Sequence, residues 1–480
     1  MSRIVVGPFN RVEGDLEVQL ETDGQRVQSA RVNSPLYRGF EQILHGRVPD
    51  DALVYAPRIC GICSVSQSVA AARALGDAVG AEVPVNGERL TNLVLAAENL
   101  ADHFTHFYLF FMPDFARPHY AGRPWYDEVA RRFRAEQGGA ATDAVAARAG
   151  FLNIMGTLAG RWPHTHTIQA GGAAAAATPV QRLKVRSLLA QFRRYLEQQT
   201  FGGPLEAVAN LESPEELAAW ASTGRSDLGL FLRAAEDCDL AALGRAGDRF
   251  MSYGSYPEAG EHLFPPGLFE AGEVGPVPVA GITEDLHSSW MGGVGEPVHP
   301  WQGVTLPDLD REGAYSWCKA PRLEGRPVET GALARQVVAG HPLIRSMVAE
   351  SGGNVRNRVV ARLLELARVV PAMERWAHEL EPGAPVYAEP EALEEGSGAG
   401  LVEAARGGLG HWMRVHQGRI LNYQIIAPTT WNFSPRDRDG VPGPLEQALV
   451  GAPVEPGESS PVAVQHVVRS FDPCMVCTVH

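Results

Sequence analysis

Two cysteine pairs at opposite ends of the chain constrain its fold more than any other feature. Cys60 and Cys63 form one C-x-x-C motif, and Cys474 and Cys477 form a second one close to the last residue. Thiolate pairs of this kind bind soft transition metals, and two pairs make most sense as the two halves of one site. The intervening residues would then be one scaffold, so we expect a single domain over residues 1–480.

The composition limits where the chain works and what it binds. With 42 basic and 56 acidic residues the net charge is −14, which disfavours nucleic acid and anionic membranes as partners. Six cysteines in 480 residues do not make a disulfide framework, and without a visible signal peptide they indicate reduced thiols. We expect a cytoplasmic location unless a partner carries an export signal for both chains. The most apolar stretch, residues 93–111, carries Glu98, Asp102 and two histidines. It predicts a buried helix and no direct membrane insertion.

Hydrophobic periodicity predicts a mainly helical α+β fold, with a core bundle of long helices and small peripheral sheets. Strands are expected over residues 3–7, 15–21 and 26–32, and a hairpin over 410–426 around Gln417 and Gly418. Helices are expected over residues 64–78, 88–111, 128–137, 140–149, 180–199, 335–346, 357–380 and 444–449. Pro371 should kink or break the helix over 357–380, and residues 382–400 should form a surface loop.

Two alternatives to a catalytic or sensory metal centre follow from the cysteines alone. A structural four-cysteine zinc site usually has its pairs about 15–20 residues apart, whereas Cys63 and Cys474 are separated by 411 positions. A redox dithiol would use one pair and leave the other idle. His164 and His166 lie in a loop and are more often structural than ligating, and Cys238 and Cys318 are most simply buried, inert thiols. From the residues alone, a transition-metal centre and structural zinc stay equally open.

Ordered motifs along the whole chain resemble the large subunit of nickel–iron hydrogenases. The first cysteine pair lies in R-x-C-G-x-C, and the second lies in D-P-C-x-x-C-x-x-H at the end of the sequence. The other matching motifs lie, in the family's order, at residues 11–14, 38–41, 405–412, 422–424 and 428–432. The resemblance therefore covers the chain from end to end and favours an enzyme that converts H2 to two protons and two electrons.

The resemblance implies a role for each cysteine. Cys60 and Cys474 would be terminal nickel ligands. Cys63 and Cys477 would bridge nickel to an iron that carries two cyanides and one carbon monoxide, a Ni-Fe(CN)2(CO) centre. Glu13, which locally resembles an ordinary turn carboxylate, would take a proton from the thiolate of Cys474.

Further residues are implied around this centre. Three charged residues would lie over the metals: Arg406, Asp102 and Asp472. Two others, Pro428 and Thr429, would pack against or hydrogen-bond the cyanides. A Mg2+ ion would be held by Glu41, the backbone carbonyl of Ile425 and the side chain of His480. Oxygen ligands completed by water suit that metal.

Departures from the family pattern resemble its regulatory, H2-sensing branch. Gln67 stands where the family usually has histidine, and Ile62 and Phe110 stand where a smaller valine and leucine line the gas passage. The sequence also ends at His480, where precursors in the family extend further. That branch is cytoplasmic and O2-tolerant, turns over slowly and reports to a histidine kinase. An uptake hydrogenase that feeds a respiratory chain is the alternative; a non-catalytic scaffold and a zinc protein are more remote.

Electrons released from H2 need a way out of the chain. Cys238 and Cys318 alone cannot hold an iron–sulfur cluster. The resemblance therefore implies a small subunit that carries the iron–sulfur clusters. We expect a heterodimer, with a dimer of heterodimers left open.

Overall fold

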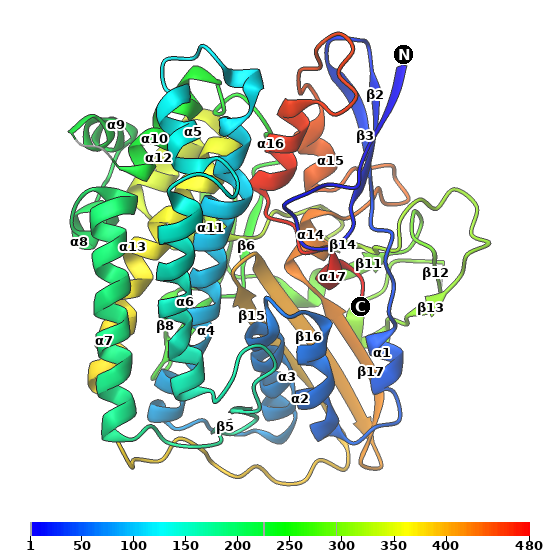
Figure 1. Cartoon of the computed structure of the whole chain (residues 1–480). Helices are drawn as coiled ribbons and strands as arrows, with labels where there is room; N and C mark the ends of the chain where they lie inside the picture. Colours follow the sequence, from blue (N-terminus) through cyan, green and yellow to red (C-terminus); the bar gives the residue numbers. More distant parts are fainter. Residues whose placement is uncertain (1, 224–225, 294) are drawn as a thin grey trace.

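Long helices fill one side of the molecule and small antiparallel sheets fill the other (Figure 1). The computed structural model describes residues 2–223, 226–293 and 295–480. Its helices are α1 Phe40–Leu44, α2 Ala52–Tyr55, α3 Ser64–Val79, α4 Val85–Thr105, α5 Tyr126–Phe133, α6 Ala140–Leu158, α7 Pro179–Tyr195, α8 Leu205–Ala209, α9 Pro214–Thr223, α10 Asp227–Asp237, α11 Ala332–Val338, α12 Pro342–Ser351, α13 Val355–Glu379, α14 Pro428–Asn432, α15 Pro444–Leu449, α16 Val462–Ser470 and α17 Met475–Thr478. The predicted helical α+β architecture is confirmed.

The strands form several separate sheets. The three-stranded sheets join β1 Ser2–Val6, β2 Glu17–Thr22 and β3 Val27–Asn33; β6 Phe250–Ser252, β9 Gly267–Glu270 and β10 Glu273–Gly275; and β15 Gly396–Ala404, β16 Gly407–His416 and β17 Arg419–Ile426. The two-stranded sheets join β4 Ile168–Gln169 with β5 Gly172–Ala173, β7 Ser255–Glu258 with β8 Glu261–Phe264, β11 Ile282–Asp285 with β14 Ala320–Leu323, and β12 Met291–Gly292 with β13 Leu306–Pro307. The predicted hairpin corresponds to β16 and β17.

Several secondary-structure predictions are wrong in part. The helix expected over residues 335–346 is divided into α11 and α12, because Gly340 has a positive φ of 76° and Pro342 begins a new helix. Helix α13 runs unbroken through Pro371. The proline removes one backbone donor, but the residues on both sides of it are buried. The apolar helix ends earlier than predicted, at Thr105, and continues as a π-helix over His106–Phe111. The predicted loop over residues 382–400 ends in strand β15. At Pro371 and in β15, the packing of the surrounding chain overrides the local signal.

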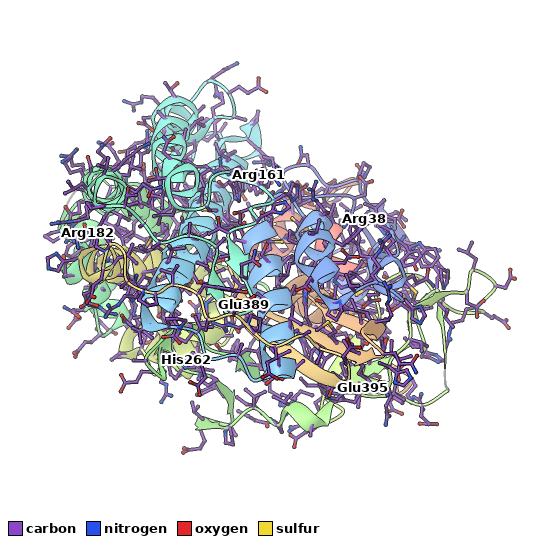
Figure 2. All side chains as sticks on the ribbon, turned by 90° about the horizontal axis from the view of Figure 1, so that it is seen from below. Arg38, Arg161, Arg182, His262, Glu389 and Glu395 are labelled. Carbon is purple, nitrogen blue, oxygen red and sulfur yellow. The ribbon has the colours of Figure 1, made fainter. Side chains whose placement is uncertain are left out.

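The segment before β15 crosses the end of the helices. Ala388 donates its backbone N–H to the carbonyl of Gly171 (3.0 Å), and Asn86 at the start of α4 donates to Glu381 (3.0 Å). In the view of Figure 2, this segment passes Glu389 and reaches the β15–β17 sheet at Glu395. It therefore ties the helical side of the molecule to the β15–β17 sheet.

Helix α3 packs directly against the backbone of β15, which fixes where the first cysteine pair lies. A Cβ atom added to Gly398 would lie 2.1 Å from the carbonyl oxygen of Ala74, and one added to Gly400 would lie 1.9 Å from that of Ala70. The helix contributes alanines at these contacts, so both sides of the interface are small. The close approach holds the first turn of α3, and with it Cys63, against the sheet.

The turn between β15 and β16 is short and buried. Only Ala405 and Arg406 separate the two strands. Gly407 follows with φ 131°, and a Cβ there would lie 2.4 Å from the hydroxyl of Thr330. A larger residue would not fit, so the turn is fixed and points Arg406 into the molecule.

The β1–β3 sheet is joined to α15 through a buried carboxyl group. Glu446 accepts hydrogen bonds at one oxygen from the backbone of Val32 (2.9 Å) and the hydroxyl of Tyr315 (2.8 Å), while its other oxygen has no hydrogen-bond partner among the described residues. Burial raises the pKa of Glu446 to about 7, although these hydrogen bonds oppose the shift. The folded protein therefore holds a proton here at pH values where the unfolded chain has lost it.

The variant Glu446→Gln tests this carboxyl group. Between pH 4.5 and 7 the folded wild-type protein binds more protons at Glu446 than the unfolded chain does, so its stability falls as the pH rises. Relative to the variant, the free energy of unfolding should fall by at most about 1.4 kcal/mol per pH unit in this window. Urea unfolding at several pH values measures it. Parallel curves would contradict the prediction, and the exposed exchange Glu391→Gln is the control.

The two ends of the chain meet beside the sheet. Glu13 pairs with Cys474 in an isolated parallel β-bridge, and the C-terminus lies in the middle of the molecule (Figure 1). The segment after α16 therefore enters the core between the loop that carries Glu13 and the start of α3. No helix in the described residues is long and apolar enough to cross a membrane.

Candidate metal centre

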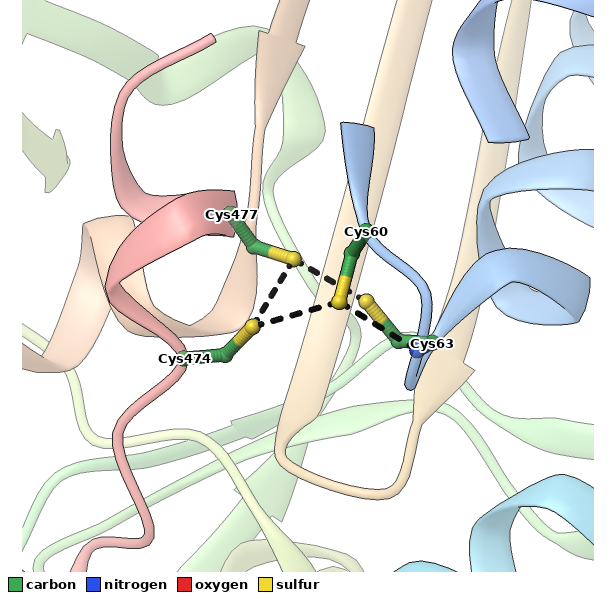
Figure 3. Close-up of side chains that lie close together, drawn as sticks. All are labelled: Cys60, Cys63, Cys474 and Cys477. Carbon is green, nitrogen blue, oxygen red and sulfur yellow. Dashed lines mark hydrogen bonds between the residues drawn. The ribbon is translucent and has the colours of Figure 1, made fainter. Parts of the chain in front are cut away.

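The four cysteine sulfurs lie together in the core (Figure 3). The Sγ atoms of Cys63 and Cys477 are 3.0 Å apart, and those of Cys60 and Cys474 are 3.5 Å apart. All four lie within 4.8 Å of one another. Within the described part of the chain, they form the one cluster of three or more Cys, His, Asp and Glu ligand atoms suited to a metal ion.

Both pairs are placed by helix starts. Cys63 directly precedes α3, and Cys474 directly precedes α17, which contains Cys477. The backbone N–H groups of Ile62 (3.2 Å) and Cys63 (3.5 Å) also point to the sulfur of Cys60. Positive helix ends and N–H donors stabilise thiolates, as the sequence predicted for the first pair.

The donor set fits a metal centre bound by thiolates. Two sulfurs bound to one ion at about 2.3 Å lie at most about 4.6 Å apart, which is close to the spread seen here. Hydrogen bonds from the other three cysteines, first Cys474, hold the pKa of Cys60 well below its ordinary value. Geometry alone would suit zinc as well as nickel.

Charged groups lie beside the sulfurs. Arg406 forms an ion pair with Asp102 on α4 (2.8 Å) and with Asp472 (3.2 Å), and it donates to the backbone carbonyl of Asp472 (2.7 Å). All three are buried. Burial, with Asp472, Cys60 and Glu98, raises the pKa of Asp102 to about 8, against the effect of Arg406. The structure brings the three predicted charged residues together.

Glu13 is held beside Cys474 through its backbone. Met475 donates its N–H to the carbonyl of Glu13 (2.7 Å), and Glu13 donates to the carbonyl of Pro473 (3.4 Å). The side chain of Glu13 is half-buried, and burial, followed by the charge of Cys60, raises its pKa. A carboxyl group that can take up a proton therefore lies next to the sulfurs.

A small cavity adjoins the end of the chain. It has a volume of about 10 Å³, room for one water or ion, and Glu41, Ile425 and His480 line it with Glu284 and Lys319. Glu41 accepts a hydrogen bond from the backbone of Ile425 (2.8 Å). The Nε2 atom of His480 is buried without a hydrogen-bond partner among the described residues. The carboxylate oxygens and this free imidazole nitrogen fit a hard cation such as Mg2+.

The comparison with protein families decides between nickel and zinc. The model described as "Nickel-dependent hydrogenase" matches residues 38–121 and 226–480, which include all four cysteines. The chain belongs to the nickel-dependent hydrogenase family. It is the H2-activating large subunit of a hydrogenase, so the sequence-based prediction of a nickel–iron hydrogenase enzyme is confirmed.

Known hydrogenases match this chain over its full length. The periplasmic nickel–iron–selenium hydrogenase large subunit of Desulfomicrobium baculatum is 30% identical over 516 residues, covering 100% of this chain and 95% of the relative. The uptake hydrogenase large subunit of Rhodobacter capsulatus is 27% identical, covering 100% and 95%. The reduced nickel–iron–selenium hydrogenase of D. vulgaris Hildenborough has a TM-score of 0.86 at 29% identity, with full coverage of both chains.

Several side chains surround the hydrogenase centre, and only some of them were predicted from the sequence. Thr429 on α14 accepts a hydrogen bond from the backbone of Cys474 (3.1 Å), and Pro428 begins the same helix. Gln67 on α3 accepts from Nε2 of His411 (2.8 Å), whose Nδ1 accepts from the hydroxyl of Tyr423 (2.7 Å). Burial lowers the pKa of His411 to about 3, so the ring is neutral.

Sequence reasoning missed His411, Tyr423 and Glu98. The buried carboxylate of Glu98 accepts hydrogen bonds from the backbone of Val65 (2.8 Å) and Ser66 (2.9 Å), in the first turn of α3. The sequence feature that could have revealed Glu98 is a carboxylate within an apolar helix. For His411 the signal was its place in the motif over residues 405–412.

The remaining candidates contribute no side-chain ligand to this cluster. Ile62 is half-buried between two ligands, and Phe110 is half-buried in the π-helix that follows α4. His164 donates from Nδ1 to the carbonyl of Pro57 (2.9 Å), which is a structural contact. Cys318 is buried as predicted, whereas Cys238 is only half-buried.

Proposed function

We propose that the four thiolates hold a Ni-Fe(CN)2(CO) centre at which H2 is converted to two protons and two electrons. The observation that carries this proposal is the buried cluster of Cys60, Cys63, Cys474 and Cys477 with its sulfurs within 4.8 Å. When bound, such a centre supplies two soft metals and an open coordination position for H2. Cys60 and Cys474 would be terminal ligands, and Cys63 and Cys477 would bridge.

Residues of this chain would accept the proton released from H2 and supply charge around the centre. Glu13 lies beside Cys474 and would accept the proton released there. Arg406, held by Asp102 and Asp472, would place a positive charge beside the thiolates. Mg2+ in the small cavity would tie the end of the chain to α1.

An iron–sulfur small subunit is the expected partner. Several relatives are named large subunits or large chains. Cys238 and Cys318 lie on separate segments and make no cluster site with the other described residues. The electrons would therefore leave through clusters of a partner in a heterodimer.

The finer proposal is that this hydrogenase is an O2-tolerant H2 sensor. It is supported by Ile62 and Phe110, which are larger than the valine and leucine of the family pattern, and by Gln67 in place of histidine. Bulky side chains in a gas passage hinder O2 more than H2. A sensor would turn over slowly, work in the cytoplasm and signal through a histidine kinase.

The second candidate is an uptake hydrogenase that feeds a respiratory chain. It is supported by the relatives, which include uptake and quinone-reactive hydrogenases and one named periplasmic. The two roles differ in turnover, electron acceptor and response to air.

Infrared absorption of the purified heterodimer under H2 and then under air tests the proposal, together with nickel and iron analysis. Bands of metal-bound carbon monoxide and cyanide that shift under H2 are expected. Their return to a ready state in air favours the sensor, and fast turnover with quinone-linked dyes favours the uptake enzyme. Stoichiometric zinc without these bands would refute the proposed centre.

The gas-passage argument predicts the behaviour of a double variant. Ile62→Val with Phe110→Leu should leave H2 oxidation intact without O2 and make it sensitive to air, because the smaller side chains widen the passage. Activity is followed by H2 consumption with and without air. The pair Ile154→Val and Phe151→Leu makes the same exchanges in the core around α6 and serves as the control. Unchanged tolerance in the first pair would contradict the argument.

A further inference from the structure

The loop that carries Glu13 is fixed on both sides. The backbone of Glu13 itself is held by Pro473 and Met475 of the cysteine segment. Arg11 and Gly14 flank it with positive φ angles of 55° and 79°. The residues before Glu13 are held by other contacts, which the proposed mechanism does not use.

Asp114 is the centre of those contacts. It is fully buried in the 3-10 turn Met112–Ala116, and its carboxylate lies within ion-pair distance of Arg11, Arg117 (2.5 Å) and Arg469 (2.6 Å). Burial would raise the pKa of Asp114, but the positive groups around it, first Arg469, hold the pKa below its ordinary value. The carboxylate is therefore charged and outnumbered by arginines.

Arg469 links the carboxylate of Asp114 to the segment before Glu13 and to the helix before Cys474. It donates to the backbone carbonyl of Asn10 (2.9 Å) and to the side-chain oxygen of Asn10 (2.6 Å). It also lies near the end of α16, the helix that leads into the segment with Cys474. One buried ion cluster thus joins residues 10 and 11, directly before the Glu13 loop, to the helix before the ligand.

We propose that Asp114, acting through Arg11, is a positioning residue that sets the place of the Glu13 carboxyl group relative to Cys474. The inference rests on the proposed role of Glu13 as proton acceptor. Proton transfer needs the two groups within hydrogen-bond reach, about 2.6–3.2 Å. A displacement of about 1 Å can lower a rate by about a hundredfold. Buried charge-assisted hydrogen bonds resist such a displacement.

Arg11 and Arg117 provide a matched pair for the test. Both contact the same oxygen of Asp114, and their side chains are similarly exposed, 19% and 24%. Arg11→Met and Arg117→Met remove the same charge from the same carboxylate, but only Arg11 belongs to the Glu13 loop. A difference between the variants therefore reports position and not charge.

Two measurements on the purified heterodimer are compared, with nickel and iron content checked first. Amide hydrogen exchange followed by mass spectrometry reports the order of residues 8–16. Isotope exchange between D2 gas and water reports the proton transfer. Arg11→Met should speed amide exchange in residues 8–16 and slow isotope exchange by about tenfold to a hundredfold. Arg117→Met should leave both near wild type, and Arg11→Lys should restore part of the loss.

The outcomes separate the inference from the proposed function. Equal losses in Arg11→Met and Arg117→Met would assign the effect to charge and overturn the inference. Unchanged amide exchange or unchanged isotope exchange in Arg11→Met would overturn it as well. Full isotope exchange in Glu13→Gln would place the failure in the proposed role of Glu13. Arg11→Met added to Glu13→Gln should cause no further loss, which a general structural defect would.

Discussion

Replacing Glu13 by glutamine is expected to lower the rate of H2 oxidation by about 10²–10⁴-fold, the usual contribution of a general acid or base. Glutamine keeps the size of the side chain but cannot take up the proton. The backbone contacts that hold residue 13 beside Cys474 do not involve the side chain, so the loop should keep its position. The rate is measured by H2 consumption with an artificial electron acceptor.

The control for this variant is Glu21→Gln, which changes an exposed carboxylate on β2 of the neighbouring sheet. It should retain the wild-type rate. Nickel and iron content and the infrared bands should match the wild type in both variants, which separates proton transfer from metal binding. A Glu13→Gln enzyme with more than about one tenth of the wild-type rate would contradict the proposed role, given the size of the effect expected.

Replacing Arg335 by methionine is expected to destabilise the fold by about 3–5 kcal/mol, the cost of breaking a buried ion pair. Arg335 is buried in α11, donates to Glu365 (3.0 and 3.1 Å) and to Glu403 (2.7 Å), and also donates to the carbonyl of Ala405. Without the arginine, two buried carboxylates lose their counter-charge. Urea unfolding followed by circular dichroism measures the loss.

Two further variants define the cause of that loss. Adding Glu365→Gln and Glu403→Gln to Arg335→Met removes the unpaired charges, so the triple variant should be more stable than the single one. Arg326→Met breaks an ion pair with Glu270 at a side chain that is 55% exposed, and should change stability by about 1 kcal/mol or less. A triple variant as unstable as the single variant would show that packing, not charge, dominates.

The four cysteines could be predicted as one site because their chemistry is carried by the residue type and its spacing. Two C-x-x-C motifs without a disulfide framework allow few other uses, whatever fold surrounds them. The choice of nickel over zinc needed the family motifs, because the sulfur geometry suits both metals. The helical fold followed from periodicity, since long amphipathic helices have a strong local signal.

The groups that tune the site could not be found in the same way. Gln67 and His411 are 344 positions apart and meet only because α3 packs on the β15–β17 sheet. Asp114 appears in sequence as one acidic residue after an apolar helix, and its arginines come from three separate segments. Such contacts depend on long-range packing, which carries no local pattern. The π-helix after α4 could not be predicted either, because no local sequence pattern marks it.

Because the centre is built from Cys60 and Cys474, its two halves are synthesised at different times. A ribosome that adds about 5–20 residues per second needs about 20–80 s to make the 411 positions between Cys63 and Cys474. During that interval the first thiol pair has no partners, while helices α3 to α13 and strands β15 to β17 are being made. The four-thiolate site can therefore form only after the segment with Cys474 and Cys477 has been made, so any metal that needs all four sulfurs must enter after Cys60 and Cys63 have already waited through that interval.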